Sequence, residues 1–409
     1  MKTLKTLLIT LAVGLFIMHC SSNDPMTPPS DPPRSLSTLE KTLVASSNTF
    51  GFDLFSHMAL SRGDANTFIS PLSISMALGM AYNGAEGSTA DAMRTVLGYR
   101  DMTTAEINAT YKALIDLLTT LDSEVIMEIA NSSWARQDFA LLPAFSQALA
   151  EWFNAEARTL DFSDPASVDV INNYISEKTH GKIEDMLDEI DPSTVLFLIN
   201  ALYFKAAWTT EFDTEKTLDG SFILEDGSTA ACKMMHLYDT FQWGANHEVN
   251  IIDLPYGDGH YSMTLVQPAE GRRLDELLNS FTAEQWNTWL ALLNETEMDL
   301  YMPRFKVEDD WELKEVLSAM GMGVAFTGGA DFSKINADRD IFISEVLHRT
   351  FVEVTEAGTE AAAVTVVDFR ETSIKPMMNL NRPFLYVIRD HHSGTLMFMG
   401  TLYTPVENE

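Results

Sequence analysis

Apolar and polar residues alternate with a helical period in the first third of the chain. Ser70 and Pro71 mark a helix start, because serine caps free backbone N–H groups and proline suits the first helical position. Apolar residues then recur three or four positions apart until Gly84 and Gly87 end the run. The pattern predicts three helices in succession, over residues 71–84, 88–98 and 107–121.

Strand patterns dominate the later part of the chain. The unbroken apolar run over 195–204 is typical of a strand that is covered on both faces. Shorter runs separated by Gly and Asp turns predict further strands at 126–130, 251–254, 262–267, 298–302, 384–388 and 395–403. Helices that precede strands predict an α+β fold with mixed or antiparallel sheets.

The first twenty residues have the pattern of a secretory signal peptide. Lys2 and Lys5 form a positive start, and the apolar run over 6–18 is too short to span a membrane as a stable helix. The run ends at Cys20, which resembles the lipidation site of bacterial lipoproteins, although His19 departs from the small residue usual there. We expect export from a bacterial cell, followed either by anchoring as a cell-surface lipoprotein or by plain cleavage and secretion.

A proline-rich stretch over 21–35 predicts a stiff, extended tether. Residues 36–409 contain no second linker of this kind and no obvious repeat, so they predict one domain, which we expect to be a monomer. The membrane is then reached only through a lipid on Cys20.

The charge balance excludes one class of partner. The net charge is −32, from 27 basic and 59 acidic residues, so no nucleic-acid partner is expected. Apart from Cys20 the only cysteine is Cys232, which leaves no internal disulfide if Cys20 is lipidated. The sequence has no cysteine or histidine motif of a metal site, and neither a metal nor another cofactor is expected.

Eight short motifs follow one another along the chain, at 66–78, 171–172, 179–183, 198–205 with Trp208, 302–305, 330–333, 356–363 and 381–384. In this order and spacing they resemble the serpin family, and the resemblance covers about residues 36–405. It implies a serpin fold of mixed sheets with surrounding helices and an exposed reactive centre loop at about 356–379. It also implies a suicide-substrate inhibitor of serine proteases, with cysteine proteases as a second target class, rather than an enzyme.

The segment over 359–367 sorts its side chains into two faces if it forms a strand. One face is small or apolar, whereas the other carries charges at its ends, which suits a strand that enters a sheet with one face on the core. An exposed alanine-rich connector and a permanent strand are the alternatives. Gly358 provides the backbone freedom of a hinge. The expected hinge residues are Glu356, Gly358, Thr359, Ala361, Ala362 and Ala363.

Insertion of such a strand releases enough free energy to do work. A strand of about ten residues adds roughly ten hydrogen bonds of about 0.5–1.5 kcal/mol each, comparable to the stability of a whole domain. Serpin loop insertion is a recognised example of strand addition. The implied cycle has a protease form its acyl-enzyme on the loop. The cleaved loop then inserts and distorts the protease before deacylation, which leaves a covalent one-to-one complex.

Counting inward from the family motifs on either side of the loop gives the same reactive bond, Thr372–Ser373. The small Thr372 side chain suits a shallow primary pocket, which favours an elastase-like serine protease as the partner. Arg370, followed by Glu371, is the alternative reactive residue and suits a trypsin-like pocket.

Four polar residues, Ser70, Ser73, Asn200 and His348, meet by the same resemblance beneath the sheet, where its central strands part. A buried network that exchanges partners is able to hold a sheet closed and then release it. A plain core histidine is the alternative for His348. Trp208 is expected near the end of the sheet where insertion begins, with core packing as its alternative role. A Ser/His hydrolase is rejected because the chain lacks a Gly-x-Ser-x-Gly elbow.

Two rival functions stay open at this point. One is a non-inhibitory serpin that acts as a carrier or chaperone, against which the small residues of the hinge argue. The other is a surface-tethered lipoprotein that binds other partners.

Overall fold

The computed structural model describes residues 33–99, 101–337, 341–359 and 376–405. Contacts divide the chain into two units, Met1–Arg34 and Ser35–Glu409, and all the described helices and strands lie in the second. The expected signal peptide, Cys20 and most of the tether lie outside the described residues, as do residues 360–375 of the expected loop. No helix in the described ranges is long and apolar enough to cross a membrane.

Capping residues begin several of the helices. Ser37 and Glu40 form a capping box at the start of α1 (Thr38–Arg62), and the Ser70 hydroxyl accepts from the Ser73 backbone N–H at the start of α2 (Pro71–Tyr82). The other helices are α3 (Gly87–Val96), α4 (Thr104–Leu118), α5 (Pro143–Phe153), α6 (Ala166–Lys178), α7 (Leu274–Leu278), α8 (Ala283–Leu290) and α9 (Lys314–Leu317). Three short turns are helical as well, η1 (Thr214–Lys216), η2 (Ser318–Met322) and η3 (Gly323–Phe326).

The three predicted helices are confirmed, with shifted ends. The first is α2, with Ser70 as its cap. The second, α3, begins one residue earlier than expected, at Gly87. The third, α4, begins at Thr104 because Thr103 and Glu106 form a capping box in front of the apolar run.

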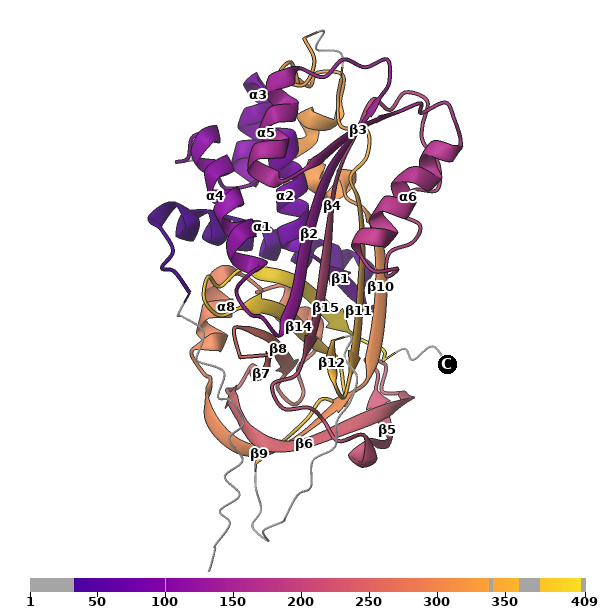
Figure 1. The fold of residues 1–409 in the computed structure, drawn as a ribbon. Helices are drawn as coiled ribbons and strands as arrows, with labels where there is room; N and C mark the ends of the chain where they lie inside the picture. The colour runs from indigo at the N-terminus through magenta and orange to yellow at the C-terminus, as the bar shows by residue number, and fades with distance from the viewer. Residues whose placement is uncertain (1–32, 100, 338–340, 360–375, 406–409) are drawn as a thin grey trace, which may run out of the picture. The chain divides into compact units, whose positions relative to one another are not determined.

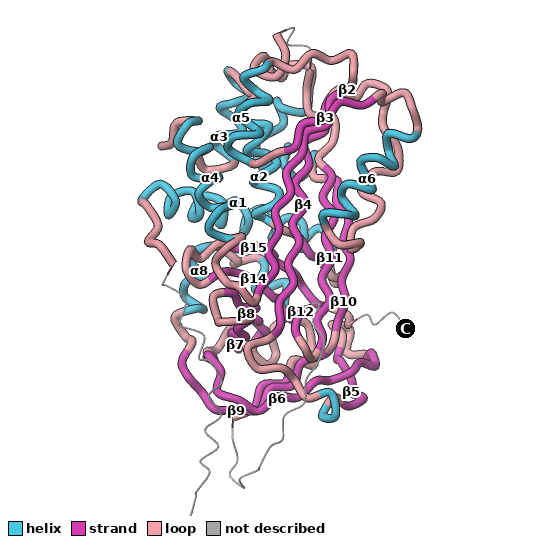
Figure 2. The backbone as a smooth tube through the Cα atoms, in the orientation of Figure 1, coloured by secondary structure: helices cyan, strands magenta, loops and turns pink. Residues whose placement is uncertain are grey.

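A six-stranded sheet carries the site (Figure 1). Its order over the described residues is β10-β11-β12-β4-β2-β3, and among these strands only β2 and β3 run parallel. The strands are β2 (Val125–Arg136), β3 (Glu156–Leu160), β4 (Leu196–Ala207), β10 (Phe305–Glu312), β11 (Leu347–Thr355) and β12 (Gly358–Thr359). Figure 2 shows β2, β4, β11 and β10 side by side, with α6 beside them.

The nine-stranded sheet has the order β1-β15-β14-β8-β7-β6-β9-β13, with β5 paired to β6 off this path. The last three residues of the expected exposed loop, 377–379, instead form strand β13, which pairs in parallel with β9. The strands are β1 (Thr67–Ile69), β5 (Leu218–Ile223), β6 (Thr229–Ala245), β7 (Val249–Tyr256), β8 (Tyr261–Pro268), β9 (Asn294–Pro303), β13 (Met377–Asn379), β14 (Phe384–Asp390) and β15 (Leu396–Leu402). Both sheets mix parallel and antiparallel pairs, which confirms the predicted fold class.

Strand β4 is covered on both faces, as its apolar run predicts. Leu202 and Phe204 pack into the main core, whereas Ile199 and Ala201 belong to a second apolar cluster that includes Tyr174 of α6. Alternate side chains of a strand point to opposite faces, so Asn200 shares the main-core face with Leu202 and Phe204.

Candidate functional site

Strand β12 lies between β4 and β11 and carries the first described residues of the expected hinge. Thr359 pairs with Ala206 of β4 on one side and with Val354 of β11 on the other, antiparallel in both cases. Glu356, Ala357 and Thr359 are only 2–3% exposed. Residues 356–359 are therefore buried, and the expectation of a loop that is exposed from residue 356 onward is wrong for these four residues. The backbone groups of β4 and β11 offer hydrogen-bond partners here, and the chain enters the sheet to use them.

Gly358 is required at its position by close contact as well as by backbone conformation. Its φ is +139°, a backbone conformation that residues with a side chain rarely adopt. A Cβ atom at this position would lie 2.2 Å from the carbonyl oxygen of Ala206 and 2.9 Å from the backbone nitrogen of Trp208. Any larger residue would push β12 away from β4.

Thr359 is held by an aromatic pair beneath it. Its hydroxyl lies 2.8 Å from the hydroxyl of Tyr256, and the Tyr256 ring stacks on Trp208 with centroids 4.4 Å apart. The Trp208 indole N–H donates to the Thr355 carbonyl, and its backbone N–H donates to the Ala357 carbonyl, both at 3.0 Å. Trp208 therefore contacts the chain on the way into and out of the turn between β11 and β12, besides packing in the core.

Glu356 is anchored by two residues that the sequence reasoning did not single out. Arg304 donates to both carboxylate oxygens, and the Thr217 hydroxyl lies 2.5 Å from Oε1. Burial alone would raise the pKa of Glu356, but these hydrogen bonds outweigh it and the pKa is lowered. Arg304 belongs to the Met-Pro-Arg-Phe motif at 302–305, which is one of the sequence motifs described above. No pattern in the sequence indicated that it pairs with Glu356.

The four polar residues expected to meet are brought together behind β4 and β11. The Ser70 backbone N–H donates to His348 Nε2 at 3.0 Å, and the Ser73 hydroxyl donates to the Asn200 carbonyl at 3.2 Å. The Asn200 side-chain amide donates to Oδ1 of Asn131 at 2.8 Å. Asn131, on β2, is a member of this network that the sequence reasoning missed.

The protonation of His348 follows from its surroundings. Burial lowers the pKa of His348 to about 3, so the ring is neutral near pH 7. Because Nε2 accepts from Ser70, the ring proton resides on Nδ1. Asn200 is 8% exposed, and its Oδ1 has no hydrogen-bond partner among the described residues. The network thus contains a donor, His348 Nδ1–H, and an acceptor, Asn200 Oδ1, on neighbouring members.

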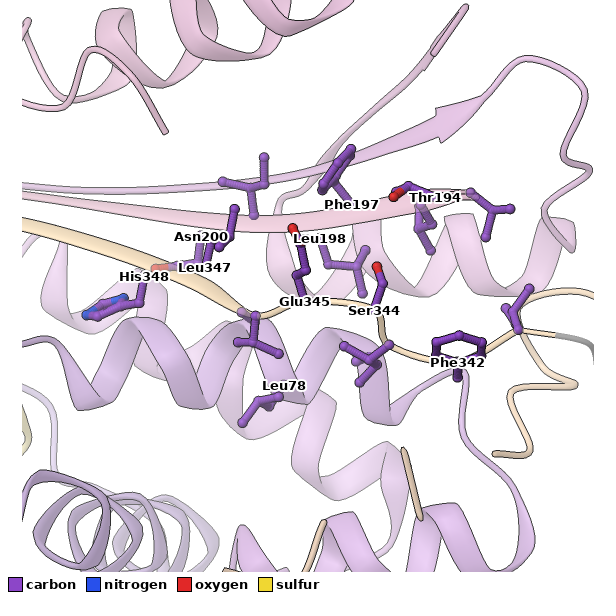
Figure 3. Close-up of a pocket in the computed structure, with 18 of the residues that line it drawn as sticks. Leu78, Thr194, Phe197, Leu198, Asn200, Phe342, Ser344, Glu345, Leu347 and His348 are labelled. Atoms are coloured by element: carbon purple, nitrogen blue, oxygen red, sulfur yellow. The ribbon is translucent and has the colours of Figure 1, made fainter. Parts of the chain in front are cut away.

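A cavity of about 300 Å³ adjoins this network (Figure 3). It lies between β4 and the segment 341–348 that leads into β11, with α2 as a third wall. In Figure 3, Asn200 and His348 lie towards one end and Phe342 towards the other. Over the described residues β4 and β11 are joined through β12 rather than directly, so the two strands part towards the cavity.

Several expected site residues lie outside the described part of the chain. These are Ala361, Ala362 and Ala363 of the hinge, the candidate reactive residues Arg370, Glu371, Thr372 and Ser373, and the lipidation residue Cys20. Their roles stay predictions. In the ranges that are described, no group of three His, Cys, Asp or Glu residues is arranged to hold a metal ion.

A family model described as "Serpin (serine protease inhibitor)" matches residues 45–405. The chain belongs to the serpin family. Iripin-8 of Ixodes ricinus is 33% identical over 88% of this chain and 93% of its own length. The leukocyte elastase inhibitor of Xenopus tropicalis is 32% identical over 89% of this chain and 100% of its own. Serpins are generally protease inhibitors rather than enzymes.

Solved serpin structures share the fold. A crystal structure of human thyroxine-binding globulin superimposes with a TM-score of 0.84 at 27% identity, covering 90% of this chain and 100% of that one. That protein is named for binding thyroxine, so the fold by itself does not define what a member does.

Proposed function

We propose that this serpin is an exported suicide-substrate inhibitor of serine proteases whose cleaved loop inserts between β4 and β11. The observation that carries the proposal is the separation of these two strands. β12 occupies two residue positions between them, and a cavity of about 300 Å³ lies farther along. A segment that continues β12 finds backbone partners on both sides, which satisfies groups that would otherwise lack them.

The register of β12 indicates which loop residue reaches the polar network. Continued for six residues past Thr359, the same antiparallel register places Thr365 opposite Asn200 of β4 and His348 of β11. Because alternate residues share a face, the Thr365 side chain points to the core side, as Thr359 does. A hydroxyl there is able to donate to Asn200 Oδ1 and to accept from His348 Nδ1–H. Insertion thereby completes the network instead of disrupting it.

The chemistry of trapping belongs to the protease. Its catalytic serine attacks the carbonyl of Thr372, an ester forms to the enzyme, and the new amino terminus at Ser373 is released. The serpin contributes the loop, a hinge at Gly358 and the strand position. Each residue that enters the sheet adds hydrogen bonds, and the total of about 5–15 kcal/mol is available to deform the attached enzyme.

We propose an elastase-like target, with the bond after Thr372 as the reactive bond. The small side chain of Thr372 supports this choice, and so does similarity to a leukocyte elastase inhibitor at 32% identity. Cleavage after Arg370 by a trypsin-like enzyme is the competing outcome.

One experiment tests the inhibitory function directly. The serpin is mixed with elastase, and an SDS-stable adduct of one-to-one mass is expected, together with a released peptide that begins at Ser373. Elastase with a blocked catalytic serine is the control and yields no adduct. Rapid cleavage without any adduct would rule out the inhibitory assignment, and a peptide that begins at Glu371 would move the reactive bond to Arg370.

A pair of substitutions tests the inserted register. Thr365→Val keeps the shape of the side chain and removes the hydroxyl, which leaves Asn200 Oδ1 buried without a donor. We expect Thr365→Val to divert more serpin into the cleaved, unattached form, and Thr365→Ser to trap elastase as the unsubstituted protein does. Equal trapping by both variants would contradict the register.

We also propose that the protein is anchored outside the cytoplasm by a lipid on Cys20. The basic start, the apolar run over 6–18 and Cys20 support this, whereas His19 counts against lipidation. On expression in a bacterium, Cys20→Ser is expected to move the protein from the membrane fraction to the soluble exported fraction. Cys232→Ser, at the buried cysteine, is the matched control and leaves it in the membrane fraction.

A carrier serpin is the second candidate, favoured by the structural similarity to thyroxine-binding globulin. A carrier would be cleaved in its loop without trapping the protease. The same is expected of a surface lipoprotein that only binds partners, so the elastase adduct separates the proposed function from both.

A further inference from the structure

The cavity between β4 and residues 341–348 has the lining of a small-molecule site. Its walls are mainly apolar and include Leu78 of α2, Leu198 of β4 and Leu347 of β11. At about 300 Å³ it has roughly twice the volume of an engineered cavity that binds benzene. A largely apolar pocket with a few converging polar groups is the usual form of a ligand site.

The polar end of the cavity defines the head group of a ligand. Asn200 Oδ1 is an acceptor without a partner on a side chain that is more than nine-tenths buried, and His348 Nδ1–H is a donor. A hydroxyl group is the smallest group that serves both, because it donates one hydrogen bond and accepts others. A hydrocarbon would leave Asn200 Oδ1 without a hydrogen-bond donor.

Charged head groups are excluded by the same surroundings. His348 is neutral and offers no counter-ion to a buried carboxylate, and an ammonium group has only donors, so it is unable to accept from His348 Nδ1–H. Exposed Glu345 lies between the two ends of the cavity, near Leu347 in Figure 3, and it repels anionic ligands. The ligand that fits is therefore neutral.

We propose that this cavity binds a neutral alcohol whose apolar body has about ten carbon atoms, with its hydroxyl between Asn200 and His348. The bound alcohol occupies the place that Thr365 takes on insertion, so it converts the inhibitor into a substrate. This second consequence rests on the proposed function, whereas binding itself does not.

The binding test uses 4-phenyl-1-butanol as the probe, with butylbenzene and 4-phenylbutyrate as comparators, measured by calorimetry on the full chain. The alcohol is expected to bind at least tenfold more tightly than the butyrate. Asn200→Leu is expected to weaken binding of the alcohol about 10- to 100-fold, because the buried hydroxyl loses its acceptor. The affinity for butylbenzene is expected to change less than threefold. Asn379→Leu, at an asparagine of β13 that does not line the cavity, is the matched control and leaves both unchanged.

A second variant keeps the proposal testable if Asn200→Leu fails to fold. Ala77→Leu adds bulk to the α2 wall of the cavity and is expected to weaken binding of both the alcohol and butylbenzene at least tenfold. Ala105→Leu, on the exposed face of α4, is its control. Unchanged binding to Ala77→Leu would overturn the site, and an equal response of alcohol and hydrocarbon to Asn200→Leu would overturn the role of the hydroxyl.

The regulatory consequence is measured with elastase. Saturating alcohol is expected to raise the number of serpin molecules consumed per trapped elastase at least threefold, and serpin cleaved in its loop is expected to bind the alcohol at least tenfold more weakly. No change in this number would overturn the regulation. If the intact serpin binds the alcohol but never traps a protease, the site is supported and the proposed inhibitory function fails.

Discussion

Arg304 binds Glu356 through both carboxylate oxygens, with Nε 2.8 Å from Oε1 and 2.7 Å from Oε2. Arg304 lies between β9 and β10, and Glu356 lies between β11 and β12. The pair therefore joins the start of the hinge to a junction between the two sheets. Planar, two-point pairing of this kind restricts the orientation of both side chains.

Removal of Arg304 is expected to destabilise the uncleaved protein. Arg304→Met leaves the buried carboxylate of Glu356 without its counter-ion, which costs about 3–5 kcal/mol in a fully buried pair. Because Arg304 is 36% exposed, we expect about 2–3 kcal/mol, measured as the free energy of unfolding in urea. Lys334→Met, which breaks the exposed pair with Glu86, is the control and should cost less than about 1 kcal/mol. Equal losses of stability in the two variants would show that the Arg304–Glu356 pair contributes no more than an exposed ion pair.

A charge at Thr359 is expected to stop trapping. Thr359 is 3% exposed and contacts Tyr256, so Thr359→Arg buries an unpaired charge or expels β12 from the sheet. Insertion slows, deacylation proceeds first, and elastase should cleave the variant with little adduct. Thr359→Val keeps the size of the side chain and should trap elastase nearly as the unsubstituted serpin does. An unchanged yield of adduct from Thr359→Arg would contradict insertion through this position.

Cleavage of the loop is expected to raise the thermal midpoint. Insertion adds roughly ten backbone hydrogen bonds of about 0.5–1.5 kcal/mol each, which corresponds to an increase on the order of 10–30 °C. Calorimetry of intact and loop-cleaved protein at one scan rate measures it. A nicked loop that did not insert would leave the midpoint unchanged or lower.

The buried histidine predicts a loss of stability in mild acid. The folded protein keeps His348 neutral because burial lowers its pKa to about 3, whereas the unfolded chain takes up a proton below about pH 6.5. The unfolded state then binds more protons, so stability falls as the pH drops from about 6.5 towards 3. Between pH 6.5 and 5 the loss is about 2 kcal/mol.

His348→Gln removes this titration and provides the comparison. Urea unfolding at pH 7, 6 and 5 should show a stability difference between the unsubstituted protein and His348→Gln that shrinks as the pH falls. A difference that stays constant across this range would show that His348 is not held neutral by the fold.

The local signals in the sequence were sufficient for many elements. The Ser70-Pro71 start of α2 was identified because a cap and a helical period involve only neighbouring residues. The long apolar run of β4 was identified for the same reason. By contrast, β5, β6, β10 and β11 were not predicted. In β11 the buried positions alternate with half-buried ones that include charged side chains, which weakens the contrast that the pattern depends on.

Contacts across long separations were decided only by the tertiary structure. The sequence itself determined the order of motifs, the flexible Gly358 and the small face of the loop, since these depend on residue type alone. The pairing of Arg304 with Glu356, 52 residues away, and of Asn200 with Asn131, 69 residues away, depends on strand order and register. A one-residue slip in register would turn these side chains to the other face of the sheet. The cavity beside Asn200 likewise exists only because β4 and β11 part, which no local pattern records.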